Sequence, residues 1–265
     1  MKPDAAAIAA ALAHRGHAGI AVHAFGTLGS TNAWFGSDEG ATVAAPALCV
    51  TDHQTRGVAR RGRQWQTLPG NLMFSVLQRV APPPAGGGLL SLVTAVAVAR
   101  TLQHETGVPI RIKWPNDLTI EHSKVAGLLI EARHEHDRRL RLVGGIGINL
   151  VEDERLAAFG ATSLARHGVS ASRRDALLVS LTDAVLSAWA RFEATGWAAF
   201  ETDWARLDTL RDRCVTVYAG AVGSSEAFDG VARGVARDGS LRIDTPTGQR
   251  RVHAGEVSVR AGAVS

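Results

Sequence analysis

The sequence predicts an α+β fold in which helices flank a mixed sheet, followed by a small C-terminal β-barrel. Short apolar runs with a period of two recur through the first half of the chain. Two long segments instead repeat their apolar residues every three to four positions, and the period of two returns after about residue 211. A chain of 265 residues exceeds one average domain, so we place a large domain at 1–210 and a small one at 211–265.

Seven strands are predicted in the large domain from apolar runs that turn residues separate. They are expected at 20–26, 46–51, 71–80, 110–114, 117–121, 124–133 and 140–150. Pro115-Asn116 marks a tight turn between two of them. Ser30-Thr31-Asn32 follows the first strand, and its hydroxyl and amide side chains are suited to begin a helix.

Two long helices are predicted from the helical period. The first begins at Leu89 and ends before Gly107, and the second spans 172–195. Ser172 and Asp175 are spaced as a capping box at the start of the second helix. Near the C-terminus, five short strands in roughly 50 residues indicate the barrel.

Composition indicates an ordinary globular protein. Apolar residues make up 46% and charged residues 20% of the chain, which is typical of a protein with a packed core. The two cysteines, Cys49 and Cys214, are too few for a disulfide framework. No run of 18 or more apolar residues occurs, so we expect no membrane span and a cytoplasmic location. The alanine-rich start favours a short surface helix that ends near Gly16 over a signal peptide.

The net charge of +4 raises the question of nucleic-acid binding. The arginines are spread along the chain and aromatic residues are only 5%, so no basic stripe is interleaved with stacking rings. The charge pattern therefore does not favour a nucleic-acid partner.

The first segment that suggests chemistry is QTRGVARRGRQW, from Gln54 to Trp65, between two predicted strands. Its arginines repel one another unless an anion joins them, and guanidinium groups match phosphate and carboxylate. Its glycines permit the backbone to close. The segment is therefore interpreted as a mobile clamp over an anion, with a solvated surface loop as the alternative.

Two further segments are KWPND at 113–117 and KVAGLLIE at 124–131. A hairpin between two strands would bring Asn116, Asp117 and Lys124 close together. A lysine at the mouth of an apolar strand, opposite an Arg-Gly loop, indicates an anion holder, although a surface ion pair is the ordinary alternative. KWPND by itself is equally interpreted as a structural turn.

Together the three segments suit a reaction in which two anions meet. A carboxylate that attacks the α-phosphate of ATP meets a repulsion of roughly 4 kcal/mol per unit-charge pair at 4 Å and an effective dielectric of 20. Cationic side chains and Mg²⁺ offset this repulsion. The acyl-adenylate product hydrolyses readily, so a closing loop has to exclude water. No P-loop and no GxGxxG after a strand is present.

Five motifs in order resemble the biotin protein ligase family: Ser30-Thr31-Asn32, Gln54 with GVARRGRQW, KWPND, KVAGLLIE, and GIGIN at 145–149. The resemblance runs from about residue 20 to 262 and includes GVARGVARDGSL and GEVSVR in the predicted barrel. It implies the class II synthetase-like, biotin-lipoate ligase fold with a C-terminal SH3-like β-barrel. It also implies an enzyme that uses ATP and Mg²⁺ to form biotinyl-5'-AMP from biotin. Biotin would then pass to a lysine of a biotin carboxyl carrier protein domain of a carboxylase.

The resemblance also implies roles for particular residues. Biotin would contact Ser30, Thr31, Asn32, Gln54, Gly57, Val58, Ala59, Arg60 and Lys124. The nucleotide would contact Arg60, Arg63, Trp65, Asn116 and Asn149. Lys124, Arg60 and Asp117 would be catalytic, and no metal ligand is assigned.

The Arg-Gly loop departs from the family's usual GRGRRGR. Val58 stands where an arginine is expected, and Ala59 where a glycine is expected. We therefore expect the loop to retain the adenylate less tightly.

Only about 19 residues precede the first predicted strand, too few for the DNA-binding domain of the family's repressor members. We therefore expect a monofunctional ligase without a DNA partner, and we leave a homodimer open. Three alternatives remain: a lipoate or octanoate ligase or transferase of related fold, a non-catalytic biotin or nucleotide sensor, and a nucleic-acid-binding module.

Overall fold

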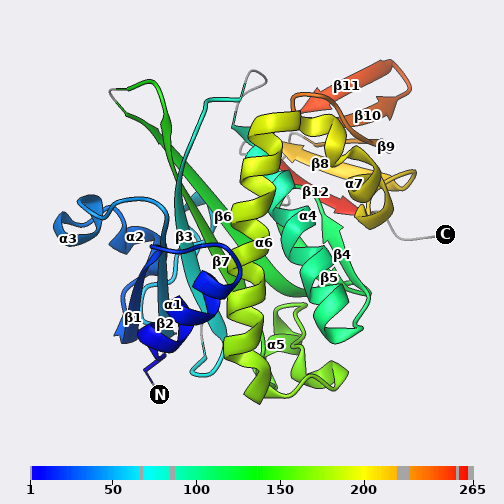
Figure 1. Ribbon diagram of the computed structural model, residues 1–265. Helices are drawn as coiled ribbons and strands as arrows, with labels where there is room; N and C mark the ends of the chain where they lie inside the picture. The colour runs from blue at the N-terminus through cyan, green and yellow to red at the C-terminus, as the bar shows by residue number, and fades with distance from the viewer. Residues whose placement is uncertain are drawn as a thin grey trace.

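The computed structural model describes residues 2–65, 68–83, 87–135, 137–219, 227–254 and 257–261. A seven-stranded mixed sheet is the larger of the two sheets in the molecule (Figure 1). Its spatial order is β1 (Ala21–Leu28), β2 (Ala47–Gln54), β3 (Leu72–Val80), β7 (Leu140–Ile148), β6 (Ser123–His134), β5 (Asp117–Ile120) and β4 (Ile110–Lys113). β1 and β2 run parallel, and the other neighbours run antiparallel. The predicted mixed sheet and its seven strands are confirmed.

Two long helices cover one face of this sheet and leave the other face for a site. α4 (Gly88–Thr106) packs on β4 and on α6 (Arg174–Thr195), which also crosses β3 (Figure 1). Successive residues of β7 point to opposite faces of the sheet, as in any strand. A Cβ on Gly144 would accordingly meet the ring of Trp189 in α6 on the helix-covered face. A Cβ on the next residue, Gly145, would meet Asn32 on the other side of the sheet.

The start of α6 differs from the prediction. Ser172 lies in the 3-10 turn η3 (Ala171–Arg173), and α6 begins at Arg174 without a side-chain cap. The Ser170 hydroxyl accepts from the backbone N of Ser172 at 3.3 Å, so Ser170 caps the preceding turn instead. The predicted capping box of Ser172 and Asp175 is therefore wrong, because the chain is already turning before Ser172.

Shorter helices connect these elements. α1 (Ala5–His14) is the predicted N-terminal helix, and it buries Ile8 and Leu12 against β1 and α6. The remaining short helices are α2 (Thr31–Trp34), α3 (Asp38–Ala41), η1 (Arg60–Gly62), α5 (Arg155–Ala158), η2 (Ala165–His167), η4 (Trp197–Ala199) and α7 (Glu201–Leu207). None of the helices in the described part of the chain combines the length and apolarity that a membrane crossing needs.

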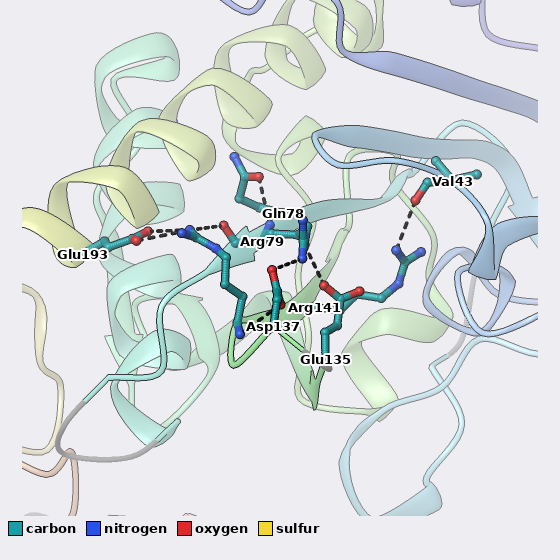
Figure 2. A network of polar contacts seen from close by, with 8 residues as sticks. Val43, Gln78, Arg79, Glu135, Asp137, Arg141 and Glu193 are labelled. Carbon is teal, nitrogen blue, oxygen red and sulfur yellow. Dashed lines mark hydrogen bonds and ion pairs between the residues drawn. The ribbon is translucent and has the colours of Figure 1, made fainter.

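The β6–β7 hairpin is tied at its tip to neighbouring elements by ion pairs (Figure 2). Arg79 of β3 pairs with Glu135 at 2.6 Å and also with Asp137. Arg139 donates to the carbonyl of Arg79 at 2.9 Å and pairs with Glu193 of α6 at 3.1 Å. Such exposed pairs contribute little energy individually, and here they join the tip of the hairpin to β3 and α6.

A second sheet follows α7. Five strands, β8 (Cys214–Ala219), β9 (Ala227–Val235), β10 (Leu241–Thr245), β11 (Gly248–Val252) and β12 (Val257–Ala261), lie in the order β11-β10-β9-β8-β12. All neighbouring pairs are antiparallel, and the five predicted C-terminal strands are confirmed. The indole Nε1 of Trp114, in the β4–β5 turn, donates to the carbonyl of Gly239 in the β9–β10 turn at 3.1 Å. The second sheet is thus anchored beside the β4–β5 turn.

Candidate active site

The face of the seven-stranded sheet opposite α4 and α6 carries a pocket, here named the central pocket. Its walls come from the start of α2, the β2–β3 loop, the β4–β5 turn, strands β6 and β7, and β12 of the second sheet. The predicted site residues that line it are Ser30, Thr31, Asn32, Gln54, Val58, Ala59, Arg60, Arg63, Trp65, Asn116, Asp117 and Lys124. The fold therefore brings together segments that are more than 90 residues apart in the sequence.

One end of the central pocket is lined by buried, uncharged polar side chains. The Ser30 hydroxyl caps α2, which places Thr31 and Asn32 in the first helical turn. Gln54, the last residue of β2, accepts through Oε1 from the backbone N of Thr31 at 2.8 Å and from its hydroxyl at 3.1 Å. The amide side chain of Gln54 is thereby oriented at the wall of the pocket.

Asn32 is held from several sides. Its Nδ2 donates to Glu131 Oε2 at 2.8 Å and to the carbonyl of Leu129 at 3.2 Å. Its Oδ1 accepts from the Ser75 hydroxyl at 2.7 Å. A Cβ on Gly145 would lie 2.3 Å from Asn32 Oδ1, so this position of β7 accommodates only glycine while Asn32 keeps its place.

The Arg-Gly loop closes as a small hairpin at the edge of the pocket. Val58 and Gln64 form an antiparallel bridge, and the backbone N of Trp65 donates to the carbonyl of Gly57 at 2.9 Å. The tip is the turn η1, in which Arg61 has a positive φ of 61°. Backbone hydrogen bonds therefore hold the two ends of the loop together while its tip presents arginines.

Trp65 lies on a floor made of two paired glycines. Gly127 of β6 and Gly147 of β7 are register partners. A Cβ on Gly127 would lie 2.9 Å from the Trp65 ring, and one on Gly147 would lie 2.7 Å from it. The Lys124 ammonium stands over the same ring, 5.2 Å from its centroid. The missing side chains at these two positions are what lets the indole reach the sheet.

The other end of the central pocket is charged. Lys124 Nζ and Asp117 Oδ1 are 2.6 Å apart, and both side chains are about one third exposed. Arg60 donates to Asn116 Oδ1 at 3.0 Å, while Asn116 Nδ2 donates to the carbonyl of Leu128 at 2.6 Å. Burial lowers the pKa of the Arg60 guanidinium, repulsion from Arg61 lowers it further, and Asp117 acts in the opposite direction. An anion bound here would relieve the unfavourable burial of this cation.

Three more cations line the pocket that the sequence analysis did not assign: Arg61 at the tip of the Arg-Gly loop, Lys113 and Arg260. Lys113 precedes the β4–β5 turn, and Arg260 comes from β12 of the second sheet. Burial lowers the pKa of the Lys113 ammonium, and the charge of Arg260 lowers it further. All three residues lie in segments that the sequence analysis singled out, QTRGVARRGRQW, KWPND and GEVSVR, so the sequence carried some indication of their place in the site.

Two predicted residues do not line the central pocket. Gly57 lies at the base of the Arg-Gly loop, where a Cβ would meet the carbonyl of Trp65 at 2.7 Å. Asn149 is buried behind β6, and it donates through Nδ2 to the carbonyl of Thr162 at 3.1 Å and accepts from Leu164 N at 2.8 Å. In this structure both residues hold backbone segments that frame the site.

The donor set of the pocket limits how a metal ion can bind. Within the described ranges, no group of three or more His, Cys, Asp or Glu side chains is placed to hold a metal ion. Among the described residues that line the central pocket, Asp117 is the one carboxylate. This set fits a Mg²⁺ ion that keeps most of its ligands from phosphates and water, and does not fit an all-protein cage.

A mixed sheet with one helix-covered face, whose other face holds a polar pocket closed by an arginine loop and a second sheet, defines the class of biotin/lipoate-type ligase folds. Residues 28–149 match the Biotin/lipoate A/B protein ligase family, and residues 222–260 match the Biotin protein ligase C terminal domain. The chain belongs to the biotin protein ligase family.

The relatives agree with this assignment, and a solved structure shares the fold. The Bifunctional ligase/repressor BirA of Escherichia coli is 30% identical over 217 residues, which cover 80% of this chain and 66% of that protein. The Biotin--[acetyl-CoA-carboxylase] ligase of Mycobacterium tuberculosis is 34% identical over 143 residues, covering 51% of this chain and 52% of that protein. A structure of the biotin protein ligase from Aquifex aeolicus in complex with biotin and ATP superposes with a TM-score of 0.75. That match has 24% sequence identity and covers 91% of this chain and 99% of the other, so it shows a shared fold.

Proposed function

We propose that the chain is an ATP-dependent biotin--protein ligase, which converts biotin to biotinyl-5'-AMP and transfers the biotin to a lysine of a biotin carboxyl carrier protein. The observation that carries the proposal is the gathering of a neutral polar end and a cationic end in one pocket. The neutral end suits a ureido ring, which both donates and accepts hydrogen bonds. The cationic end suits a carboxylate and a phosphate that react with each other.

For biotin we propose the buried amide and hydroxyl groups of Ser30, Thr31, Asn32 and Gln54 as the ureido site. Their hydrogen bonds orient them: Thr31 donates to Gln54, Ser30 accepts from the backbone N of Ala33, and Asn32 accepts from Ser75. A ligand that lacks the matching groups would leave buried polar atoms unpaired, which costs affinity. Gly57, Val58 and Ala59 would cover the ligand from the Arg-Gly loop.

For adenylation we propose that Lys124 and Arg60 hold the biotin carboxylate and the α-phosphate together. A carboxylate oxygen bonds to the α-phosphorus while the bond to the bridging oxygen breaks, and pyrophosphate leaves. Asp117 neutralises Lys124 at 2.6 Å when no anion is bound, and the incoming anion takes over that role. Arg63, Trp65 and Asn116 would contact the nucleotide, with Trp65 offering a stacking surface.

Mg²⁺ would enter with ATP and neutralise phosphate charge. Asp117 is the residue of this pocket that could contact it. Asn149, which lies outside the pocket lining, would support the nucleotide side through the segment at 162–164 that it holds.

In the transfer step, the neutral amine of the acceptor lysine attacks the acyl carbon of the adenylate. An amide bond forms, AMP leaves, and the amine gives up a proton. Asp117 is proposed to orient that amine, because its carboxylate stands at the mouth of the pocket beside Lys124.

The test is the transfer of labelled biotin to an apo biotin carboxyl carrier domain with ATP and Mg²⁺, together with biotin-dependent exchange of pyrophosphate into ATP. Lys124→Ala is expected to lower both activities by about 100-fold or more, since an electrostatic group at the reacting atoms is lost. Lys2→Ala, an exposed lysine outside the pocket, is the matched control. Exchange that requires lipoate or octanoate instead of biotin would favour the related ligase. Biotin binding without exchange would favour a sensor.

The domain division at 210 and 211 is proposed on the same grounds, since α7 ends at Leu207 and β8 begins at Cys214. A homodimer, the lack of a DNA partner and a cytoplasmic location stay predictions.

A further inference from the structure

A second concave region, here named the side cleft, adjoins the central pocket. It has a volume of about 580 Å³ and lies between β4, β5, the segment 208–213 and β12. Lys113 and Arg260 line both the side cleft and the central pocket. A macromolecule that places one side chain in the central pocket would therefore also cover the side cleft.

The side cleft carries an excess of positive charge. Five cations line it, Arg111, Lys113, Arg211, Arg213 and Arg260, against the two carboxylates Glu121 and Asp208. Among the described residues, no ion pair joins any of these cations to either carboxylate. Arg211 contacts Asp212 at 3.7 Å, outside the cleft lining. Such a concentration of like charge is unfavourable unless an anionic partner joins it.

The backbone explains why the cations gather here. In β4, Ile110 and Ile112 are buried in the core, so the alternate residues Arg111 and Lys113 point to the opposite face. Thr119 of β5 is the register partner of Arg111. Its hydroxyl is buried and has no hydrogen-bond partner within the described residues.

The lining chemistry favours an acidic polypeptide over a nucleic acid. The described side chains that line the cleft include no Phe, Tyr or Trp, and His122 is the one aromatic ring among them, so the cleft lacks the series of rings on which successive bases stack. The reaction also requires a protein to present its lysine at the neighbouring pocket.

We infer that the side cleft docks an acidic segment of the acceptor protein while the acceptor lysine enters the central pocket. This inference rests on the proposed function. The arginines Arg111 and Arg213 contribute to docking and take no part in adenylation, because neither lines the central pocket.

The test separates the two half-reactions. The double variant Arg111→Glu/Arg213→Glu is expected to raise the KM for the apo biotin carboxyl carrier domain by about tenfold or more at low salt, because attraction becomes repulsion. Pyrophosphate exchange, which needs no acceptor, should stay at the wild-type rate with an unchanged KM for ATP. Arg166→Glu, an arginine of η2 that lines neither concavity, is the matched control and should leave both activities unchanged.

Salt provides a second readout. The wild-type KM for the carrier should rise as salt is added, since exposed charges are screened within about 10 Å at 0.1 M. The double variant should show a flatter dependence.

The outcomes are distinct. A carrier KM that shifts no more than in Arg166→Glu overturns the inference and leaves the proposed function standing. A raised KM for ATP in the exchange assay also overturns it, because the cleft then serves the nucleotide phosphates. A wild-type protein that transfers no biotin overturns the proposed function itself.

Discussion

Ser75 is a buried residue whose single proton decides how the neutral end of the central pocket is oriented. Its Oγ lies 2.7 Å from Asn32 Oδ1 and 2.7 Å from Thr31 Oγ1. An amide oxygen can only accept, so the serine proton goes to Asn32. The Thr31 proton is then left for Ser75 or for Gln54 Oε1, which also accepts from the Thr31 backbone. Ser75 therefore positions two residues of the proposed ureido site without lining the pocket itself.

Ser75→Ala should raise the KM for biotin by about tenfold, since it leaves a buried acceptor unpaired, and should leave kcat nearly unchanged. Steady-state exchange kinetics over a biotin series measure this split. Ser180→Ala is the control, because Ser180 of α6 is also buried and hydrogen-bonded, accepting from Arg15 at 3.1 Å, but lies outside the pocket. An equal rise in the KM for biotin in both variants would show that Ser75 acts only through the stability of the fold.

Val58 is one of the two positions, with Ala59, at which the Arg-Gly loop departs from the pattern that the resemblance predicts. It lines the pocket yet is 46% exposed, an unusual place for an apolar side chain. Val58→Arg should slow the release of the adenylate severalfold, because a guanidinium could bond its phosphate or carboxylate. Gln64→Arg adds the same charge across the loop bridge without lining the pocket, and serves as the control. Equal release rates for wild type and Val58→Arg would contradict the idea.

At the scale of elements, the paired glycines of β6 and β7 determine how the Arg-Gly loop meets the sheet. A Cβ on Gly147 would lie 2.7 Å from the Trp65 indole, closer than real contacts allow. Gly147→Ala should therefore displace Trp65 together with the loop that it ends. We expect a rise of about tenfold in the KM for ATP and faster proteolytic cleavage within residues 57–65.

Gly144→Ala is the matched control for that variant. It adds the same methyl group three residues away on the opposite face, where it would meet Trp189 of α6. We expect it to lower the free energy of unfolding through overpacking while the KM for ATP stays unchanged. A raised KM in both variants would show that the sheet, and not the loop contact, controls nucleotide binding.

Strand and helix positions could be predicted from the sequence because periodicity reports burial directly. The interior of β3 and the two long helices are the clearest cases. The capping box failed because the choice between Ser170 and Ser172 depends on where the backbone begins to turn, which side-chain type alone does not fix.

The residues of the candidate site could be predicted from the sequence where they lie in a recognisable motif, such as KWPND. Ser75 was missed because a serine in an apolar strand gives no sign of what lies across the sheet. Gly127 and Gly147 were missed as a pair because their role depends on strand register. Arg260 was missed because its place in the pocket depends on how the second sheet is seated.

At the scale of the whole molecule, the two sheets meet at the β4–β5 turn, so the site depends on both. Trp114 is 4% exposed and donates to the carbonyl of Gly239. The β9–β10 turn, which contains Gly239, also approaches α4 closely, because a Cβ on Gly239 would lie 3.3 Å from the backbone N of Leu89. The neighbour of Trp114, Lys113, shares the pocket wall with Arg260 of β12. The indole bond therefore helps to set the distance between two cations on different sheets.

Trp114→Phe should loosen this junction while it keeps much of the apolar volume. The lost hydrogen bond and the unpaired carbonyl are expected to cost about 1–3 kcal/mol of unfolding free energy. Trp189→Phe is the matched control, because it removes a buried indole bond to Thr94 of 2.9 Å within the helical layer. Both variants should lose similar stability in denaturant titrations. Only Trp114→Phe should speed amide exchange in residues 236–240 and raise the KM for ATP, since the wall formed by Lys113 and Arg260 then opens. Equal kinetic effects in the two variants would mean that general stability, and not the seating of the second sheet, limits the reaction.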